Sequence, residues 1–145
     1  MKVVIIGGVA GGASTAARLR RLNENVSIVV LEKSGYVSFA NCGLPYHISG
    51  VISERERLLL ESVESLSSKF NIDIRVKTEV ISIERSVKKI TVQNLDTGEI
   101  YEESYDKLVI STGAKSFIPS IKGLTENNYM KLRNIEDMDK IVKYV

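Results

Sequence analysis

Residues 2–32 constrain the fold more than any other part of the chain. Residues 2–6 form a short apolar run that ends abruptly at a glycine-rich turn. Residues 10–22 are rich in Ala, Leu and Arg and favour a helix, and residues 26–31 form a second apolar run. Apolar runs of this kind are typical of parallel strands that helices cover. The order therefore predicts a βαβ unit with a right-handed crossover.

Further elements are expected downstream of this unit. Residues 34–50 predict a loop with a short helical piece, and residues 53–70 predict one charged helix. Residues 72–76 alternate as a strand does, and residues 107–111 return to the apolar pattern of a buried strand. Both runs suit additional strands of the same sheet.

A second, smaller sheet is predicted between these two runs. Residues 80–83, 90–92 and 100–105 read as short strands, and Asp96-Thr97-Gly98 forms a turn before the third. Together they predict an antiparallel meander. The expected fold class is therefore α/β, with a Rossmann-like parallel sheet and a small antiparallel β-meander in three layers.

Composition excludes several functional classes. The chain of 145 residues carries 20 Lys and Arg against 18 Asp and Glu, a net charge of +2 that is too balanced to indicate nucleic-acid binding. No apolar run approaches the roughly 18 residues of a membrane span, and the first residues lack a signal-peptide pattern. We therefore expect a cytoplasmic protein that uses neither nucleic acid nor a membrane. With one Cys and one His, no internal disulfide and no metal site are expected.

The glycine-rich turn predicts a nucleotide site. Gly7 and Gly12 match the first and third glycines of the G-x-G-x-x-G fingerprint, and Val9 stands in place of the second. The N–H groups at the start of the following helix would face a pyrophosphate. Glu32 ends the second apolar run, where an acidic group accepts hydrogen bonds from ribose hydroxyls. The alternative is a glycine-rich turn that binds nothing.

The lone cysteine lies in the most informative stretch, SFANCGLPY at residues 38–46. Pro45 requires a helix to begin within the preceding turn, so Cys42 is expected at or just before a helix N-terminus, where the dipole favours a thiolate. A buried, inert cysteine is the alternative. His47 would lie about 140° from Cys42 around a helix, so we expect a surface or packing role for it. Without a second cysteine, redox chemistry must use a substrate mixed disulfide, a sulfenic acid or a persulfide.

Three stretches together resemble a known family: residues 3–32, SFANCGLPY, and YDKLVISTGA at residues 105–114. They resemble the N-terminal FAD-binding part of the pyridine nucleotide-disulfide oxidoreductases. Within that family they are most similar to the single-cysteine branch of coenzyme A-disulfide reductases, including forms fused to a rhodanese domain. The resemblance covers essentially the whole chain, and the second fingerprint glycine is commonly absent from this branch.

The resemblance implies a cofactor, a reductant and a set of site residues. Cys42 would stand beside the flavin of FAD, NAD(P)H would reduce the FAD, and coenzyme A or its disulfide or persulfide would be the substrate. A plain strand-ending turn is the alternative for Thr112-Gly113-Ala114. The implied FAD contacts are Gly7, Gly8, Val9, Ala10, Gly11 and Gly12 at the pyrophosphate, Glu32 and Lys33 at the ribose, the Val80 backbone at the adenine, and Thr112 and Gly113. The implied substrate contacts are Ser14, Arg18, Arg21, Ser38 and Asn41.

The first predicted helix adds a physical argument for coenzyme A. Ser14, Arg18 and Arg21 share an arc of about 60° on that helix. A hydroxyl and two guanidinium groups on one stripe suit the phosphates of coenzyme A. A solvated basic face is the alternative.

The resemblance also predicts how much of the enzyme this chain represents. Family members continue with an NAD(P)H-binding domain and a dimerisation domain, and the full-length protein is expected to be a homodimer. Residues 1–145 would be the N-terminal part of an FAD/NAD(P)-binding domain. The last expected elements are a strand at residues 129–132 and a helix that Asn134 caps and that is still running at Val145. We expect this chain alone to bind FAD weakly or not at all and to be inactive.

The leading functional prediction is an FAD-dependent NAD(P)H oxidoreductase that reduces coenzyme A disulfide or a coenzyme A-linked persulfide or polysulfide. One alternative is an NADH oxidase or peroxidase in which Cys42 cycles through a sulfenic acid. A second is a non-catalytic nucleotide-binding module in which Cys42 is structural.

Overall fold

The computed structural model describes residues 1–125 and 127–145. The chain divides into two compact units. Unit 1 comprises residues 1–39 and 61–112, and unit 2 comprises residues 40–60 and 113–145. Each unit is described by itself below.

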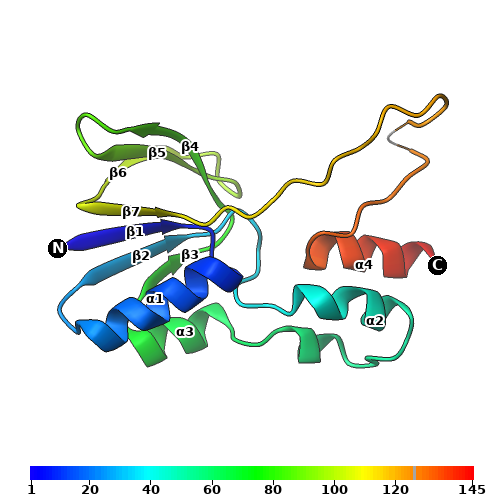
Figure 1. The fold of residues 1–145 in the computed structure, drawn as a ribbon, viewed down its shortest axis with the longest axis horizontal. Coiled ribbons are helices and arrows are strands. Elements are labelled where there is room, and N and C mark those ends of the chain that lie inside the picture. The colour runs from blue at the N-terminus through cyan, green and yellow to red at the C-terminus, as the bar shows by residue number, and fades with distance from the viewer. Residues whose placement is uncertain (126) are drawn as a thin grey trace. The chain divides into compact units, whose positions relative to one another are not determined.

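Unit 1 is built on a parallel sheet of four strands in the order β3-β2-β1-β7 (Figure 1). In the register, Val4 of β1 pairs with Val29 on one side and with Leu108 on the other. Helix α1 joins β1 to β2, so the predicted βαβ unit is confirmed. The bounds are β1 Lys2–Ile6, α1 Ala10–Leu22, β2 Ser27–Leu31, β3 Asp73–Arg75 and β7 Lys107–Ile110.

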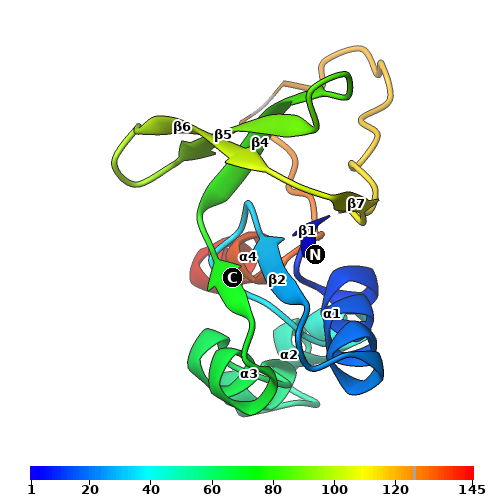
Figure 2. The ribbon, with the colours of Figure 1, turned by 90° about the vertical axis from the view of Figure 1, so that its left-hand side faces the viewer.

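The second sheet of unit 1 is an antiparallel meander of β4 (Thr78–Glu84), β5 (Lys89–Asn94) and β6 (Ile100–Ser104). Figure 2 shows it on one side of the parallel sheet, with α1 and α3 (Val63–Phe70) on the other. The predicted fold class, a parallel sheet with a small antiparallel meander, is confirmed.

Alternation along β1 produces a separate core on each face of the parallel sheet. Val3 and Ile5 are buried in the cluster that contains Ala16 of α1. Val4 is fully buried in the other cluster, with Ile90 and other residues of the meander. Because both faces are covered, β1 has no polar position between Val3 and Ile6, as the sequence pattern predicted.

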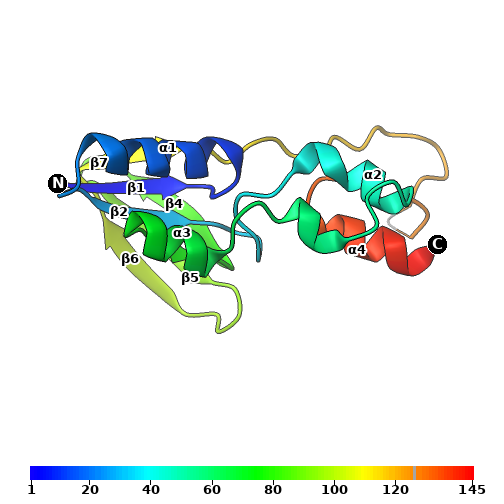
Figure 3. The ribbon, with the colours of Figure 1, turned by 90° about the horizontal axis from the view of Figure 1, so that it is seen from below.

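Among the residues that the structure describes, unit 2 contains two short 3-10 helices and the α-helices α2 and α4, which Figure 3 labels. Helices α2 and α4 pack against each other. The Asn134 side chain accepts a hydrogen bond from the Asp137 N–H at 2.9 Å, which confirms the predicted N-cap. The bounds are η1 Asn41–Gly43, α2 Leu44–Ile48, η2 Arg55–Leu58 and α4 Ile135–Tyr144.

Two sequence predictions are wrong. Residues 53–70 form two short helices, η2 and α3, rather than one, because the Leu58 carbonyl bonds to Ala40 and Leu59 is extended. Residues 129–132 pair with no strand in the described part of the chain, and Met130 and Leu132 are exposed. An apolar run becomes a strand only where a neighbouring edge accepts its backbone groups.

No helix within residues 1–125 and 127–145 has both the length and the hydropathy required to cross a bilayer.

Candidate nucleotide site and candidate redox cysteine

The glycine turn of unit 1 brings three backbone segments into close contact. Gly7 has a φ of +97°, and a Cβ there would lie 2.3 Å from the Ser111 carbonyl oxygen. A Cβ on Gly12 would lie 1.7 Å from the carbonyl oxygen of Gly7. Neither position admits a side chain, so the tight turn and the close helix–strand approach that the fingerprint predicts are both present.

Glu32 stabilises this turn from the end of β2. Its carboxylate is buried and accepts the Gly8 N–H at 2.6 Å through Oε2 and the Ser34 N–H at 2.8 Å through Oε1. Hydrogen bonds to a charged acceptor are among the stronger ones in proteins. Sequence reasoning assigned Glu32 only a ribose contact. Its role in holding the turn was missed, because spacing does not reveal backbone donors.

The start of α1 has the features of an anion site. Val9 makes no side-chain cap, and the first turn contains no acidic residue. The first N–H groups of a helix lack intrahelical partners, and the dipole makes that end positive. Together with the close backbone approach at Gly7 and Gly12, this arrangement fits the pyrophosphate of a dinucleotide.

The other cofactor residues implied by the sequence lie in varied settings. Lys33 is exposed, and its Nζ lies 2.6 Å from Glu79 Oε1. Val80 is half-buried and pairs with Val92 in the meander. Thr112 is exposed just beyond the carboxyl end of β7, where ligands of parallel sheets bind. Gly113, in unit 2, has a φ of +69°, and a Cβ there would lie 2.8 Å from an Arg133 nitrogen.

The lone cysteine belongs to unit 2 and is an exposed free thiol. Cys42 lies in η1, directly before α2, which has Pro45 in its first turn, so the predicted placement at a helix start is confirmed. Asn41 is exposed beside it. His47 Nδ1 lies 2.7 Å from the Ile52 carbonyl oxygen, consistent with the packing role predicted for it.

The predicted stripe on α1 is exposed. Ser14, Arg18 and Arg21 are all solvent-accessible, and the Arg21 guanidinium lies 5.8 Å from the centre of the Phe70 ring. In the part of the chain that the structure describes, Arg18 has no hydrogen-bond or ion-pair partner. Ser38, the remaining implied substrate contact, is half-buried in unit 1 with a left-handed φ of 47°.

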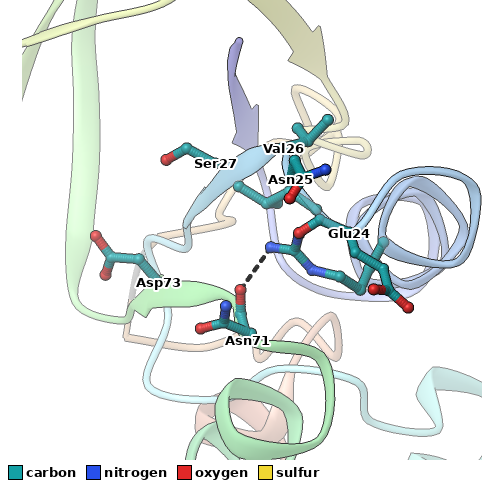
Figure 4. Close-up of a pocket in the computed structure, with 8 residues that line it drawn as sticks. Glu24, Asn25, Val26, Ser27, Asn71 and Asp73 are labelled. Atoms are coloured by element: carbon teal, nitrogen blue, oxygen red, sulfur yellow. Dashed lines mark hydrogen bonds between the residues drawn. The ribbon is translucent and has the colours of Figure 1, made fainter.

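A cavity of about 340 Å³ lies at the amino ends of strands β2 and β3, away from the glycine turn (Figure 4). Ser27 and Asp73, which begin β2 and β3, line it. Ligands of parallel sheets bind at the carboxyl ends of the strands, so this cavity is not the nucleotide site. Arg20 spans it by donating to the backbone carbonyls of Phe70, Glu24 and Asn71, the last drawn as a dashed line. Its function there is structural.

No group of three His, Cys, Asp or Glu side chains among the described residues is arranged to hold a metal ion.

The parallel sheet, the glycine turn and the separate meander define the class of α/β proteins with the FAD/NAD(P)-binding fold. Residues 1–144 match the pyridine nucleotide-disulphide oxidoreductase family, and the chain belongs to it.

Three relatives show which members of the family this chain is similar to. The coenzyme A disulfide reductase of Staphylococcus haemolyticus is 38% identical over 144 residues, which are 99% of this chain and 32% of that protein. The crystal structure of reduced Bacillus anthracis CoADR-RHD is 52% identical with a TM-score of 0.92, covering 99% of this chain and 26% of that one. The NAD-dependent persulfide reductase from A. fulgidus is 36% identical with a TM-score of 0.93, covering 99% and 27%. The chain thus spans about a third of the length of the curated relatives it matches.

Proposed function

We propose that this chain is the FAD-binding part of an enzyme that reduces coenzyme A disulfide, or a coenzyme A-linked persulfide or polysulfide, through Cys42. The observation that carries the proposal is the exposed free thiol of Cys42, the only cysteine in the chain. This chain belongs to the pyridine nucleotide-disulphide oxidoreductase family, and its relatives include proteins named coenzyme A disulfide reductase and persulfide reductase.

The residues of unit 1 fit the adenosine diphosphate end of FAD. The backbone of residues 7–12 and the uncapped start of α1 would hold the pyrophosphate. Glu32, with Lys33 beside it, would face the ribose, because a carboxylate oxygen has capacity for a further donor after one N–H bond. Val80, Thr112 and Gly113 complete the proposed set. When bound, FAD would supply the electron pair that reopens a disulfide on Cys42.

The chain's own chemistry is a thiol–disulfide exchange. The Cys42 thiolate attacks one sulfur of coenzyme A disulfide, a new bond forms between Cys42 Sγ and that sulfur, and coenzyme A leaves as a thiolate. Two electrons and one proton then restore the Cys42 thiolate and release the second coenzyme A as a thiol. NAD(P)H is the proposed source of these electrons in the longer enzyme, which we propose to be a homodimer.

Substrate recognition is assigned to the basic stripe of α1. Arg18 and Arg21 are exposed cations that can each make paired hydrogen bonds to a phosphate, and Ser14 adds a hydroxyl. Asn41 directly precedes Cys42, and Ser38 lies in the same sequence stretch. These five residues are the proposed substrate contacts.

Mass spectrometry of the chain tests the thiol chemistry. Incubation with coenzyme A disulfide should add one coenzyme A moiety at Cys42 and release one equivalent of free thiol, and Cys42→Ser should add none. A wild-type chain that alkylates with iodoacetamide but forms no adduct with coenzyme A disulfide would contradict the proposal. If peroxide converts Cys42 to a sulfenic acid faster than coenzyme A disulfide forms its adduct, the oxidase or peroxidase alternative would be favoured instead.

The proposed phosphate contacts of α1 are tested by comparing coenzyme A disulfide with a disulfide that carries no phosphate. Combined Arg18→Ala and Arg21→Ala substitution should slow the reaction with coenzyme A disulfide about tenfold, because charge-assisted contacts to phosphate are lost. The reaction with neutral hydroxyethyl disulfide should not change. Arg85→Ala, which removes an exposed cation from the meander, is the control. An equal effect on both disulfides would indicate that the stripe is only a solvated basic face.

A further inference from the structure

We propose that Leu58 of η2 is a positioning residue for the Cys42 thiol, and that Gly43 is required because Leu58 occupies the space that a side chain would need. The inference rests on the proposed function, in which Cys42 is the nucleophile. It adds a second segment of unit 2, distant in sequence, to the machinery around that thiol.

Leu58 contacts Ala40 and Gly43, which lie before and after Cys42 in the same turn. Its carbonyl oxygen accepts the Ala40 N–H at 2.8 Å. Its side chain faces Gly43, where an added Cβ would lie 2.5 Å from Leu58 Cδ2. The Gly43 N–H donates to the Ala40 carbonyl at 3.0 Å and closes the turn between them. The cysteine therefore lies at the exposed tip of a turn that Leu58 supports at both ends.

The backbone at Gly43 shows why glycine is present. Its φ and ψ are −81° and −19°, a right-handed helical conformation that any residue adopts. Conformational freedom is therefore not what the position requires. What it requires is space, since Leu58 Cδ2 comes closer than any neighbour of a real Cβ would.

Leu58 has little freedom to yield that space. Leu58 is 1% exposed, so a change of its rotamer would disturb packed neighbours. The segment itself is held at its other end, where Arg55 Nε and Nη2 donate to the two carboxylate oxygens of Asp139 in α4 at 2.8 Å each. Burial of Leu58 and the bidentate salt bridge between Arg55 and Asp139 hold η2 in place. In the proposal, η2 in turn fixes the direction of the Cys42 side chain.

A rescue experiment tests the proposal on the whole chain. Gly43→Ala should shift the amide resonances of Asn41 and Cys42 and slow the reaction of Cys42 with coenzyme A disulfide about tenfold, as overpacking displaces the turn. Leu58→Val, which removes the atom in conflict, should alter the rate less than about threefold. The double variant should recover the rate of Leu58→Val and its resonance positions. If Gly43→Ala alone does not fold, the double variant is still expected to fold and react.

The outcomes separate this inference from the proposed function. A wild-type rate in Gly43→Ala, or a double variant as slow or as unfolded as Gly43→Ala, would overturn the positioning role. Leu66→Val, a buried leucine of unit 1 outside the proposed binding residues, is the matched control and should leave the Cys42 resonance unmoved. If wild-type Cys42 reacts with iodoacetamide but not with coenzyme A disulfide, the proposed function fails. The resonance shifts and the iodoacetamide rates then still decide whether Leu58 positions the thiol.

Discussion

The glycine turn shows that single residues determine this site by the side chains they lack. Gly11 and Gly12 are adjacent in α1, yet their surroundings differ. A Cβ on Gly12 would meet a backbone carbonyl, whereas a Cβ on Gly11 would meet only the Ser111 hydroxyl, at 2.4 Å. A hydroxyl can rotate away, and a backbone carbonyl in a sheet–helix junction cannot. The two positions therefore differ in their tolerance of alanine.

We expect Gly12→Ala to prevent folding or to lower the free energy of unfolding by more than about 3 kcal/mol, beyond ordinary overpacking. Gly11→Ala should stay within about 1 kcal/mol of the wild type, because improved helix propensity offsets the displaced hydroxyl. Urea unfolding followed by circular dichroism measures both. Similar losses in the two variants would show that the close contact of Gly12 with Gly7 is not what requires glycine.

Sequence reasoning reached part of this residue-level description. The fingerprint identified Gly7 and Gly12 and the physical reason for each. It did not reveal that Glu32 accepts backbone N–H groups, or that Leu58 requires a glycine after Cys42. The contacts of Glu32 with Gly8 and of Leu58 with Gly43 join different segments of the chain, and spacing within one segment carries no information about them.

At the scale of elements, the arginines of α1 lie in two different settings. Arg20 donates to three backbone carbonyls and joins the end of α1 to the end of α3. Arg18 and Arg21 are exposed. Arg20 therefore has a structural role, whereas Arg18 and Arg21 are the candidate ligand-binding arginines of the same helix.

Arg20→Ala should lower the free energy of unfolding by about 2 kcal/mol, since it leaves the carbonyls of Phe70 and Asn71 without their donor. Arg20→Lys should recover little, because an ammonium group cannot reproduce the planar fork. Arg18→Ala is the control and should stay within about 0.5 kcal/mol of the wild type. Chemical denaturation measures all three. Equal losses in Arg18→Ala and Arg20→Ala would contradict the structural role of Arg20.

The two wrong elements have a common physical cause. The run at residues 53–70 has helical composition, but the backbone of Leu58 bonds to Ala40, and Ser62 caps a new helix by accepting the Ser65 N–H. The run at residues 129–132 has apolar residues but no strand partner in the described residues. Local pattern predicted βαβ, meander and N-cap correctly because their interactions are local or repeat along one sheet. It failed where a distant segment decided the outcome.

At the scale of the whole molecule, one ionic network joins the two sheets of unit 1. Glu103 of the meander is buried and bonds to Lys2 of β1 and to Arg75 of β3, the latter at 2.6 Å. Arg75 also donates to Tyr101 at 3.2 Å and pairs with Asp73, and these partners raise its pKa. The two positive and two negative side chains of this network therefore neutralise one another where the two sheets are joined.

This network predicts how stability depends on pH. Burial opposes ionisation of Glu103, but the bonds from Lys2 and Arg75 outweigh it and hold the pKa of Glu103 below its ordinary value of 4.5. A lowered pKa in the folded state stabilises the protein above that value, and the stabilisation is lost as the pH falls through the folded-state pKa. Arg55 likewise lowers the pKa of Asp139 in unit 2, so part of the acid sensitivity belongs to that pair.

Glu103→Gln should therefore lower the free energy of unfolding at about pH 7 by about 1 to 3 kcal/mol, because Lys2 and Arg75 lose a charged partner. Below about pH 4.5 the variant should lose less additional stability than the wild type, since it has no proton to take up at this position. Glu102 lies next to Glu103 on β6, is exposed and pairs with Lys89 of β5. Glu102→Gln removes this carboxylate and should leave the acid dependence unchanged. Urea unfolding across the acid range compares the three proteins. If Glu103→Gln and the wild type lose equal stability on acidification, the acid sensitivity arises outside the edge where the two sheets meet.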